Sequence, residues 1–192
     1  MKALFTLLMK GRYQAIVGTV LFAMLALMVT PLAMLSAAIV VLATLRNGAR
    51  EGLLVAISGT LAIAGLGGLL ANMPLAYALF GLMLWLPAWA VASVLGSTQS
   101  LARSLEVAAL GGLLLVGVQY LLLGDPVAYW REILAQYLQI QLDPTVVSDL
   151  ERQQMVDGIA PWMPGGIGAS WFLATALALL IGRWGQSLLE KP

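Results

Sequence analysis

The sequence predicts an all-α protein, a polytopic membrane helix bundle of six transmembrane helices with short helices in an extracytoplasmic segment. Of its 192 residues, 61% are hydrophobic and 10% are charged, whereas soluble domains are about 45–50% apolar and about 25% charged. About 117 residues (61% of 192) are therefore apolar, which is enough for five or six spans of roughly 20 residues. Little chain remains for a soluble domain, so residues 1–192 are predicted to form a single integral membrane domain.

Apolar runs bounded by charges, proline or glycine define the spans. The first two runs form one stretch from residue 13 to residue 45, which is too long for one straight crossing of a core about 30 Å thick. Thr30-Pro31 interrupts this stretch, and proline suits the first turn of a new helix better than the middle of one. The predicted spans are residues 13–29, 32–48, 52–71, 75–95, 105–123 and 167–184, and residues 124–166 form the outer segment.

Charge favours six crossings with both termini in the cytoplasm. The inner side then carries eight basic and three acidic residues, or +5, and the outer segment carries two basic and six acidic residues, or −4, which together make the net charge of +1. The inner basic residues are Lys2, Lys10, Arg12, Arg46, Arg50, Arg103, Arg183 and Lys191.

Three alternatives concern the N-terminal half. A five-span arrangement puts the basic N-terminus and the Arg46–Arg50 turn on opposite sides, which the positive-inside rule disfavours. The short second span leaves open a re-entrant or strongly tilted pair of helices. A secretory signal peptide is the rival interpretation of the first apolar run, although a chain that keeps Met1 is expected to retain it.

Two short helices are predicted in the outer segment. Asp125-Pro126 and Asp143-Pro144 each place an N-cap before a proline at the first helical position. The second helix ends at Gly158, and residues 161–166 (PWMPGG) form a loop that enters the last span. The first helix has an apolar face of the kind that interfacial helices show. Its members are Val127, Trp130, Leu134, Tyr137, Leu138 and Gln141.

The aromatic residues near the outer surface have two interpretations. They form the belt that membrane proteins place at the bilayer interface, or some of them line an outward-facing pocket whose floor comes from the fifth span. The N-terminal end of the last helix would point at the same pocket, which suits an anionic or carbonyl-bearing ligand. The candidate ligand-binding residues are Gln119, Tyr120, Trp130, Tyr137, Trp162 and Trp171.

Small residues recur every four positions on the fourth and sixth spans, a spacing that lets membrane helices approach closely. They pack the chain's own bundle, or they dock onto a partner membrane protein or a second copy of the chain. The lipid bilayer is the other partner that the composition predicts. The two ladders are Ala88, Ala92 and Gly96, and Ser170, Ala174, Ala178 and Gly182.

Several functional classes are not expected. The chain has no Cys and no His, which removes disulfides, thiol chemistry and the usual zinc and haem ligands. None of its 19 charged residues lies deep in a predicted span, so neither an ion relay nor an intramembrane hydrolase is predicted. Phosphate-binding loops, dinucleotide fingerprints and a basic nucleic-acid face are also missing from the sequence. We therefore expect no enzyme activity, catalytic residue, metal, cofactor or nucleic-acid partner.

Four stretches carry a family resemblance: residues 1–16, residues 41–52 (VLATLRNGAREG), residues 84–91 (LWLPAWAV) and residues 123–126 (LGDP). They resemble the YybS-like family of bacterial inner-membrane proteins. That family is distantly similar to the S components of energy-coupling-factor (ECF) transporters, which are six-helix proteins that bind a vitamin or other micronutrient on the outer side. The resemblance implies location in the bacterial inner membrane and docking on a transmembrane coupling subunit driven by separate ATPases.

Two functions are therefore predicted. The first is a substrate-binding, S-component-like subunit for uptake of a small micronutrient, with that small molecule as its ligand. The alternative is a non-transporting membrane scaffold or assembly partner, which the small-residue ladders favour.

Overall fold

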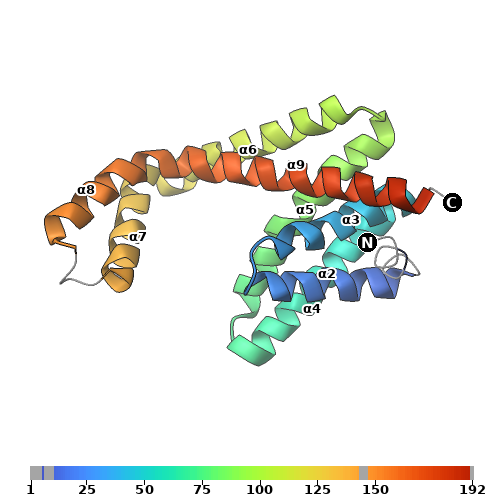
Figure 1. Cartoon of the computed structure of the whole chain (residues 1–192), viewed down its shortest axis with the longest axis horizontal. Coiled ribbons are helices and arrows are strands. Elements are labelled where there is room, and N and C mark those ends of the chain that lie inside the picture. Colours follow the sequence, from blue (N-terminus) through green and yellow to red (C-terminus); the bar gives the residue numbers. More distant parts are fainter. Residues whose placement is uncertain (1–5, 7–10, 143–146, 191–192) are drawn as a thin grey trace. The chain divides into compact units, whose positions relative to one another are not determined.

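The all-α class is confirmed by the computed structural model, which describes residue 6, residues 11–142 and residues 147–190 (Figure 1). The described residues form helices and turns without a strand. Lys2, Lys10, Asp143, Pro144 and Lys191, which entered the sequence predictions, lie outside them. The elements are α2 (Arg12–Ala26), α3 (Leu32–Asn47), α4 (Ala49–Ala71), α5 (Pro74–Thr98), α6 (Leu101–Leu123), α7 (Pro126–Gln141), α8 (Asp149–Ile159), η1 (Ala160–Trp162) and α9 (Met163–Glu190).

Among the described residues, four helical stretches are long and apolar enough to cross a membrane: α4, α5, α6 and the continuous run Asp149–Leu189, which joins α8, η1 and α9. The helices α2 and α3 are apolar but shorter, with 15 and 16 residues. At about 1.5 Å per residue they are roughly 22–24 Å long, which is less than a hydrocarbon core of about 30 Å. The structure thus supports a membrane protein with several apolar helices. That six helices cross the membrane remains a prediction.

Two local predictions have different outcomes. The Thr30-Pro31 break is confirmed, because α2 ends at Ala26 and α3 begins at Leu32. The predicted loop at residues 161–166 is wrong, because these residues continue the helical run from α8 through η1 into α9. The backbone N–H of Met163 donates to the carbonyl of Ala160. The last helix therefore does not present a free N-terminal end to a pocket at this point.

The chain divides into two compact units, Met1–Ala108 with Leu173–Pro192, and Ala109–Phe172. In the first unit, α2 to α5 form successive antiparallel hairpins. Ser36 on α3 donates a hydrogen bond to the carbonyl of Thr19 on α2, and these residues lie at similar distances from the turn that joins the two helices. The packing of Gly59 and Gly67 against residues of α5 shows the same antiparallel arrangement for α4 and α5.

A buried hydrogen-bond chain joins α5, α3 and α2 in the core of this unit. The indole N–H of Trp85, which is fully buried, donates to the Ser36 hydroxyl over 2.9 Å. That hydroxyl donates to the carbonyl of Thr19 over 2.6 Å. Because a buried N–H without an acceptor is costly, these two linked hydrogen bonds specify how the three helices pack.

Basic residues gather at one end of the first unit. The Arg12 side chain at the start of α2 forms an ion pair with Glu51 in the first turn of α4, with Nε 2.8 Å from Oε2. Arg46 lies in the last turn of α3, and Gly48 alone separates α3 from α4. The start of α2, the end of α3 and the start of α4 therefore lie together, as alternating helices require.

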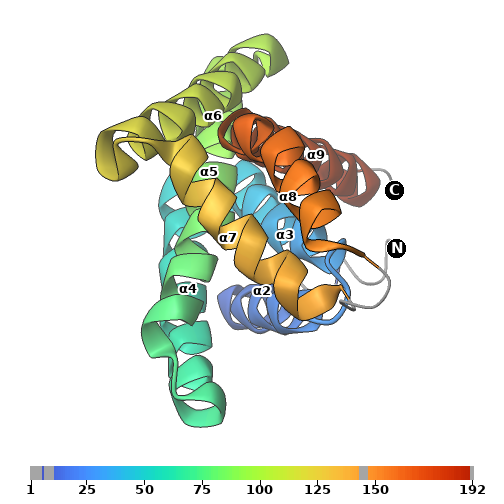
Figure 2. The ribbon, with the colours of Figure 1, turned by 90° about the vertical axis from the view of Figure 1, so that its left-hand side faces the viewer.

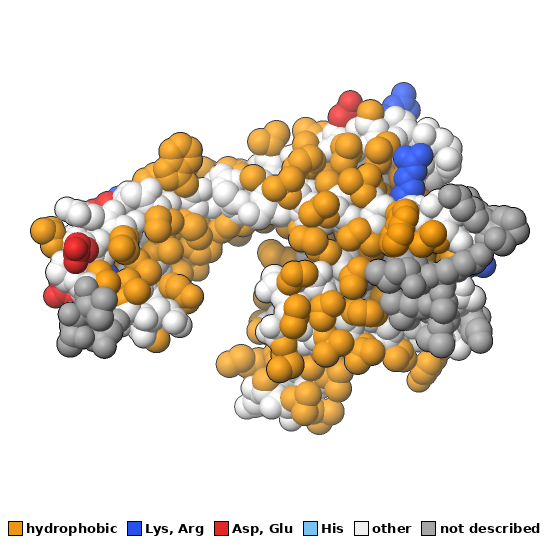
Figure 3. Space-filling model, in the orientation of Figure 1, with side chains coloured by type: hydrophobic (Ala, Val, Ile, Leu, Met, Phe, Trp, Pro, Cys, Tyr) orange, Lys and Arg blue, Asp and Glu red, His pale blue; other side chains and the backbone are white. Residues whose placement is uncertain are grey.

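The surfaces of both units are strongly apolar. Hydrophobic side chains cover wide areas of the face seen in Figure 3. An apolar groove of about 580 Å³ runs between α2 and α4 in the first unit, lined by residues such as Ile16, Val20, Ala62 and Leu66. Exposed side chains of this kind are expected where lipid, rather than water, surrounds a protein.

Candidate functional site

The second unit contains the polar groups that the sequence places outside the membrane. Its frame is an antiparallel crossing of α6 and α9, where Gly112 faces Gly168. A Cβ atom built on either glycine would lie 2.8 Å from the carbonyl oxygen of the other. Only glycine permits this backbone contact, because a side chain on either helix would push the two helices apart.

Gln119 joins three elements of this unit. Its Oε1 accepts a hydrogen bond from the indole N–H of Trp130 on α7 over 2.9 Å. Its Nε2 donates to the carbonyl of Pro164 at the start of α9 over 3.3 Å, and to that of Leu115 on its own helix over 3.5 Å. Both the oxygen and the nitrogen of the carboxamide thus form hydrogen bonds to other helices. Its role in this structure is to hold α7 and α9 against α6.

The corner between α6 and α7 follows the predicted local chemistry. Gly124 has a φ angle of +68°, which glycine adopts without the cost that other residues meet. Asp125 caps α7, because one carboxylate oxygen accepts from the backbone N–H groups of Val127 and Ala128, both over 3.0 Å. Pro126 occupies the first helical position. The cap predicted at Asp125-Pro126 is therefore confirmed.

The helix α8 begins with a capping box. The Ser148 hydroxyl accepts from the backbone N–H of Glu151 and donates to its carboxylate, which also accepts from the backbone N–H of Ser148. The Ser148 hydroxyl, and then its backbone N–H, lower the pKa of Glu151 by stabilising the carboxylate. The described part of the second short helix thus starts at Asp149, with its end at Ile159 next to the predicted Gly158.

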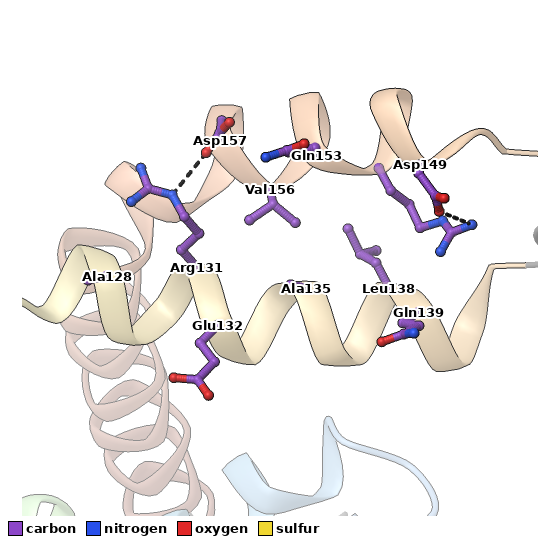
Figure 4. A pocket seen from close by; sticks show the side chains of 11 residues that line it. Ala128, Arg131, Glu132, Ala135, Leu138, Gln139, Asp149, Gln153, Val156 and Asp157 are labelled. Atoms are coloured by element: carbon purple, nitrogen blue, oxygen red, sulfur yellow. Dashed lines mark hydrogen bonds and ion pairs between the residues drawn. The ribbon is translucent and has the colours of Figure 1, made fainter.

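The helices α7 and α8 lie side by side and enclose a groove of about 480 Å³ (Figures 2 and 4). This volume falls in the range of about 300–1,000 Å³ that small-molecule sites occupy. Its apolar side chains include Ala135, Leu138 and Val156, and Val156 is almost fully buried. Figure 4 shows Leu138 and Val156 pointing into the space between the two helices. We take this as the candidate functional site and call it the α7–α8 groove.

An ion pair crosses the groove at one end, and a second pair flanks it at the other. Arg131 Nε on α7 lies 2.9 Å from Asp157 Oδ1 on α8. Within α8, Arg152 Nη2 lies 3.1 Å from Asp149 Oδ1 and also donates to the carbonyl of Val147. The Arg152 side chain is only 13% exposed, and its Nε has no hydrogen-bond partner among the described residues. The groove therefore combines an apolar floor with an arginine–aspartate pair at each end.

The six predicted ligand-binding residues do not form this groove. The structure brings Gln119 and Trp130 together in the hydrogen-bond network, while the ring of Trp171 packs against Gly111 on α6. Tyr120, Tyr137 and Trp162 are exposed, Trp162 to 78%. Instead, the groove is lined by Ala128, Arg131, Glu132, Ala135, Leu138, Gln139, Asp149, Arg152, Gln153, Val156 and Asp157.

The sequence pattern of α7 contains polar and apolar positions that line the groove, but it does not by itself predict a groove. Arg131, Glu132 and Gln139 lie off the predicted apolar face of α7, as expected. Of that face, Val127, Trp130, Leu134 and Leu138 are half-buried, whereas Tyr137 and Gln141 are exposed. The spacing along either helix does not show that Arg131, Ala135 and Leu138 face α8, because that depends on how the two helices pair.

Most ladder residues pack within the first unit. Ala88, Ala92, Ala178 and Gly182 are buried, and a Cβ on Gly182 would clash with the Val41 side chain on α3. Ala174 is half-buried. Gly96 and Ser170 are exposed, so they are the ladder positions open to an outside partner.

No cluster of three or more His, Cys, Asp or Glu residues that would hold a metal ion occurs in residue 6, residues 11–142 and residues 147–190. Both groove aspartates are paired with arginines.

We compared the chain with protein-family models, curated proteins and solved structures, and none of the three comparisons finds a match.

Proposed function

We propose that this chain is a multi-pass membrane protein that binds a small amphipathic molecule in the α7–α8 groove on the outer side. In this role it is the substrate-binding subunit of an uptake system, as the resemblance to S components implies. The observation that carries the proposal is the groove itself, which has the volume of a small-molecule site, an apolar floor and charged rims.

The topology that goes with this function has six crossing helices in the bacterial inner membrane and both termini in the cytoplasm. The cluster of Arg12, Arg46 and Arg50 at one end of the first unit supports it, because basic residues favour the cytoplasmic side. The groove helices carry the acidic residues Glu132, Asp149, Glu151 and Asp157, which fits the outer side. In this topology α2 and α3 cross as a short hairpin, through local thinning of the bilayer or extension of their ends.

The ligand class follows from the lining. An apolar body would cover Ala135, Leu138 and Val156, and an acceptor group would reach the guanidinium of Arg152. The binding subunit carries out no reaction in this proposal. Its partners are the bilayer and a membrane coupling protein that supplies the energy.

Ligand-dependent thermal stabilisation of the detergent-purified protein tests this function. Across a panel of vitamins and metabolites, we expect at least one compound to raise the melting temperature. At about one hundred times its Kd, a ligand stabilises by about 2.7 kcal/mol, which corresponds to about 5–11 °C for a chain of this size. A flat response across the panel, with no small molecule copurifying, would refute the proposal.

A pair of matched variants ties the response to the groove. Ala135→Leu fills the groove, while Ala169→Leu makes the same change at an exposed position of α9 outside it. Both exchanges suit a helix equally well. We expect stabilisation by the active compound to be lost in Ala135→Leu and kept in Ala169→Leu. Equal responses from the two variants would place the ligand elsewhere.

A second function, a scaffold that packs against another membrane protein, is favoured by the surface of α6. Its leucines Leu110, Leu113 and Leu114 are exposed, and only 11% of its most apolar 18-residue stretch is buried inside the protein. Ser170→Leu adds bulk at an exposed ladder position, and Ala169→Leu serves as the off-ladder control. If the scaffold function holds, Ser170→Leu alone should reduce crosslinked complexes. Recovery of no partner with the unmodified chain would reject it.

A further inference from the structure

An exposed apolar stripe runs along α7 on the side away from the groove. It consists of Tyr129, Ile133, Tyr137 and Ile140, which are 42%, 38%, 57% and 81% exposed. Their spacing of four, four and three residues places them on one face of the helix. We call them the Tyr–Ile stripe. Four large apolar side chains left exposed in a row on a short helix need an environment other than water.

The stripe is set apart from the polar side of α7. At about 100° per residue around the helix axis, it lies opposite Arg131 and Ala135, which line the groove. It adjoins the half-buried face of Trp130, because the rings of Tyr129 and Trp130 make an edge contact with centroids 5.5 Å apart. The helix is thus apolar on the stripe and on the face toward α6, while its side toward the groove carries Arg131 beside Ala135 and Leu138.

Trp130 also positions α7, and with it the stripe, beside the last turn of α6. Its indole binds Gln119, which precedes the last residue of α6 by about one turn. The chain then turns at Gly124, and α7 runs across the direction of the end of α6 (Figure 1). If α6 crosses the membrane, α7 therefore lies along the bilayer surface at the depth of the final turn of α6.

We infer that the Tyr–Ile stripe inserts into the outer interface of the lipid bilayer. Ile133 and Ile140 contact the acyl chains, and the hydroxyl groups of Tyr129 and Tyr137 remain at the level of the headgroups. Tyrosine suits this boundary because its ring is apolar and its hydroxyl is polar. The lipid surface is the occupant that the arrangement favours, since the stripe continues directly from a candidate span and its polar side faces away.

This placement has a consequence for the site. With the stripe in the interface, the α7–α8 groove faces away from the lipid and opens to the aqueous side. A ligand would then enter from water, while α7 remains held by the membrane. The inference depends on α6 crossing the membrane and not on ligand binding, so it stands or falls separately from the proposed binding function.

Spin labelling tests the inference directly, because the chain has no cysteine to remove. Single variants Ile133→Cys and Ile140→Cys carry the label on the stripe. Their matched controls, Glu132→Cys and Gln139→Cys, carry it one residue away on the polar side. Each labelled protein is reconstituted into vesicles of phosphatidylethanolamine and phosphatidylglycerol. Its accessibility to oxygen, which partitions into lipid, is compared with that to a water-soluble nickel chelate.

We expect the ratio of oxygen to nickel accessibility to be several-fold higher at residues 133 and 140 than at residues 132 and 139. Equal ratios within both pairs would show that water covers the stripe and would overturn the inference. Low accessibility to both reagents at the stripe would also overturn it, because another protein or a second copy would then cover this face. Ligand stabilisation of the Ile133→Cys and Ile140→Cys variants in detergent reports on the groove independently, because neither residue lines it.

Discussion

Replacement of Gln119 by leucine should loosen the second unit without changing its side-chain volume much. Gln119→Leu removes the acceptor of the Trp130 indole, at 2.9 Å, and the donor to the carbonyl of Pro164, at 3.3 Å. Both partners are partly buried, so neither is fully compensated by solvent. A net contribution of about 0.5–1.5 kcal/mol per hydrogen bond gives an expected loss of about 1–3 kcal/mol.

The assay is thermal or denaturant unfolding of the purified protein in detergent, followed by tryptophan fluorescence. Gln136→Leu is the matched control, because Gln136 is exposed on α7 and forms no hydrogen bond with the described residues. We expect that control to change stability by less than about 0.5 kcal/mol, as exposed substitutions usually do. Equal destabilisation by the two variants would refute the structural role assigned to Gln119.

A double-mutant cycle separates the indole bond from the rest. Trp130→Phe removes the donor, and combination with Gln119→Leu should give less than the sum of the two single effects. The expected coupling is about 0.5–1.5 kcal/mol, the size of one hydrogen bond. Strictly additive effects would mean that the two side chains do not interact, and would contradict this network.

Three other changes follow from contacts of named residues. Gly112→Ala should cost about 1–3 kcal/mol through overpacking against the opposing backbone, while Gly117→Ala, with no atom near its Cβ position, should be neutral or stabilising in the same unfolding assay. Ser36→Ala leaves a buried indole N–H without its acceptor and should cost about 1–3 kcal/mol, whereas the Ser93 hydroxyl bonds only its own helix, so Ser93→Ala should cost much less. Because the folded-state pKa of Glu151 is lowered, its cap stabilises α8 above the ordinary carboxyl pKa, and this contribution is lost as the pH falls through the lowered value. Protection of the amides at the start of α8 against hydrogen exchange, measured relative to the intrinsic exchange rate at each pH, should therefore fall on acidification, and a Glu151→Gln variant that kept the same pH dependence of protection would contradict this assignment.

Predictions that rest on neighbouring residues in the chain agree best with the structure. The Asp125-Pro126 cap needs only a carboxylate beside two free backbone N–H groups, so its signal is contained in four residues. The same local reasoning predicts a loop at residues 161–166, which contain two prolines and two glycines, and this prediction is wrong. Pro161 lies at the start of η1, and Pro164 is fully buried near the start of α9. Proline is tolerated where a helical turn begins, so the helical run continues through both residues.

The candidate site could not be predicted to the same extent. Gln119 and Trp130 were recognised as a polar group and an aromatic residue near the outer surface, and the structure does place them together. The carboxamide binds other helices, however, and the groove is formed by different residues. A residue type indicates which bonds a side chain can form, but the partner depends on which helices are neighbours.

By itself, the sequence determined that this protein is all-α, that several of its helices are apolar enough for a membrane, and where one short helix is capped. These properties follow from composition and from contacts within a few residues. The tertiary structure alone decided that Gly112 and Gly168 form the close crossing, and that α7 turns Arg131, Ala135 and Leu138 to α8 and leaves the Tyr–Ile stripe exposed. The physical reason is that helical spacing defines the faces of each helix, whereas the pairing of those faces depends on turns and on contacts between residues far apart in the chain.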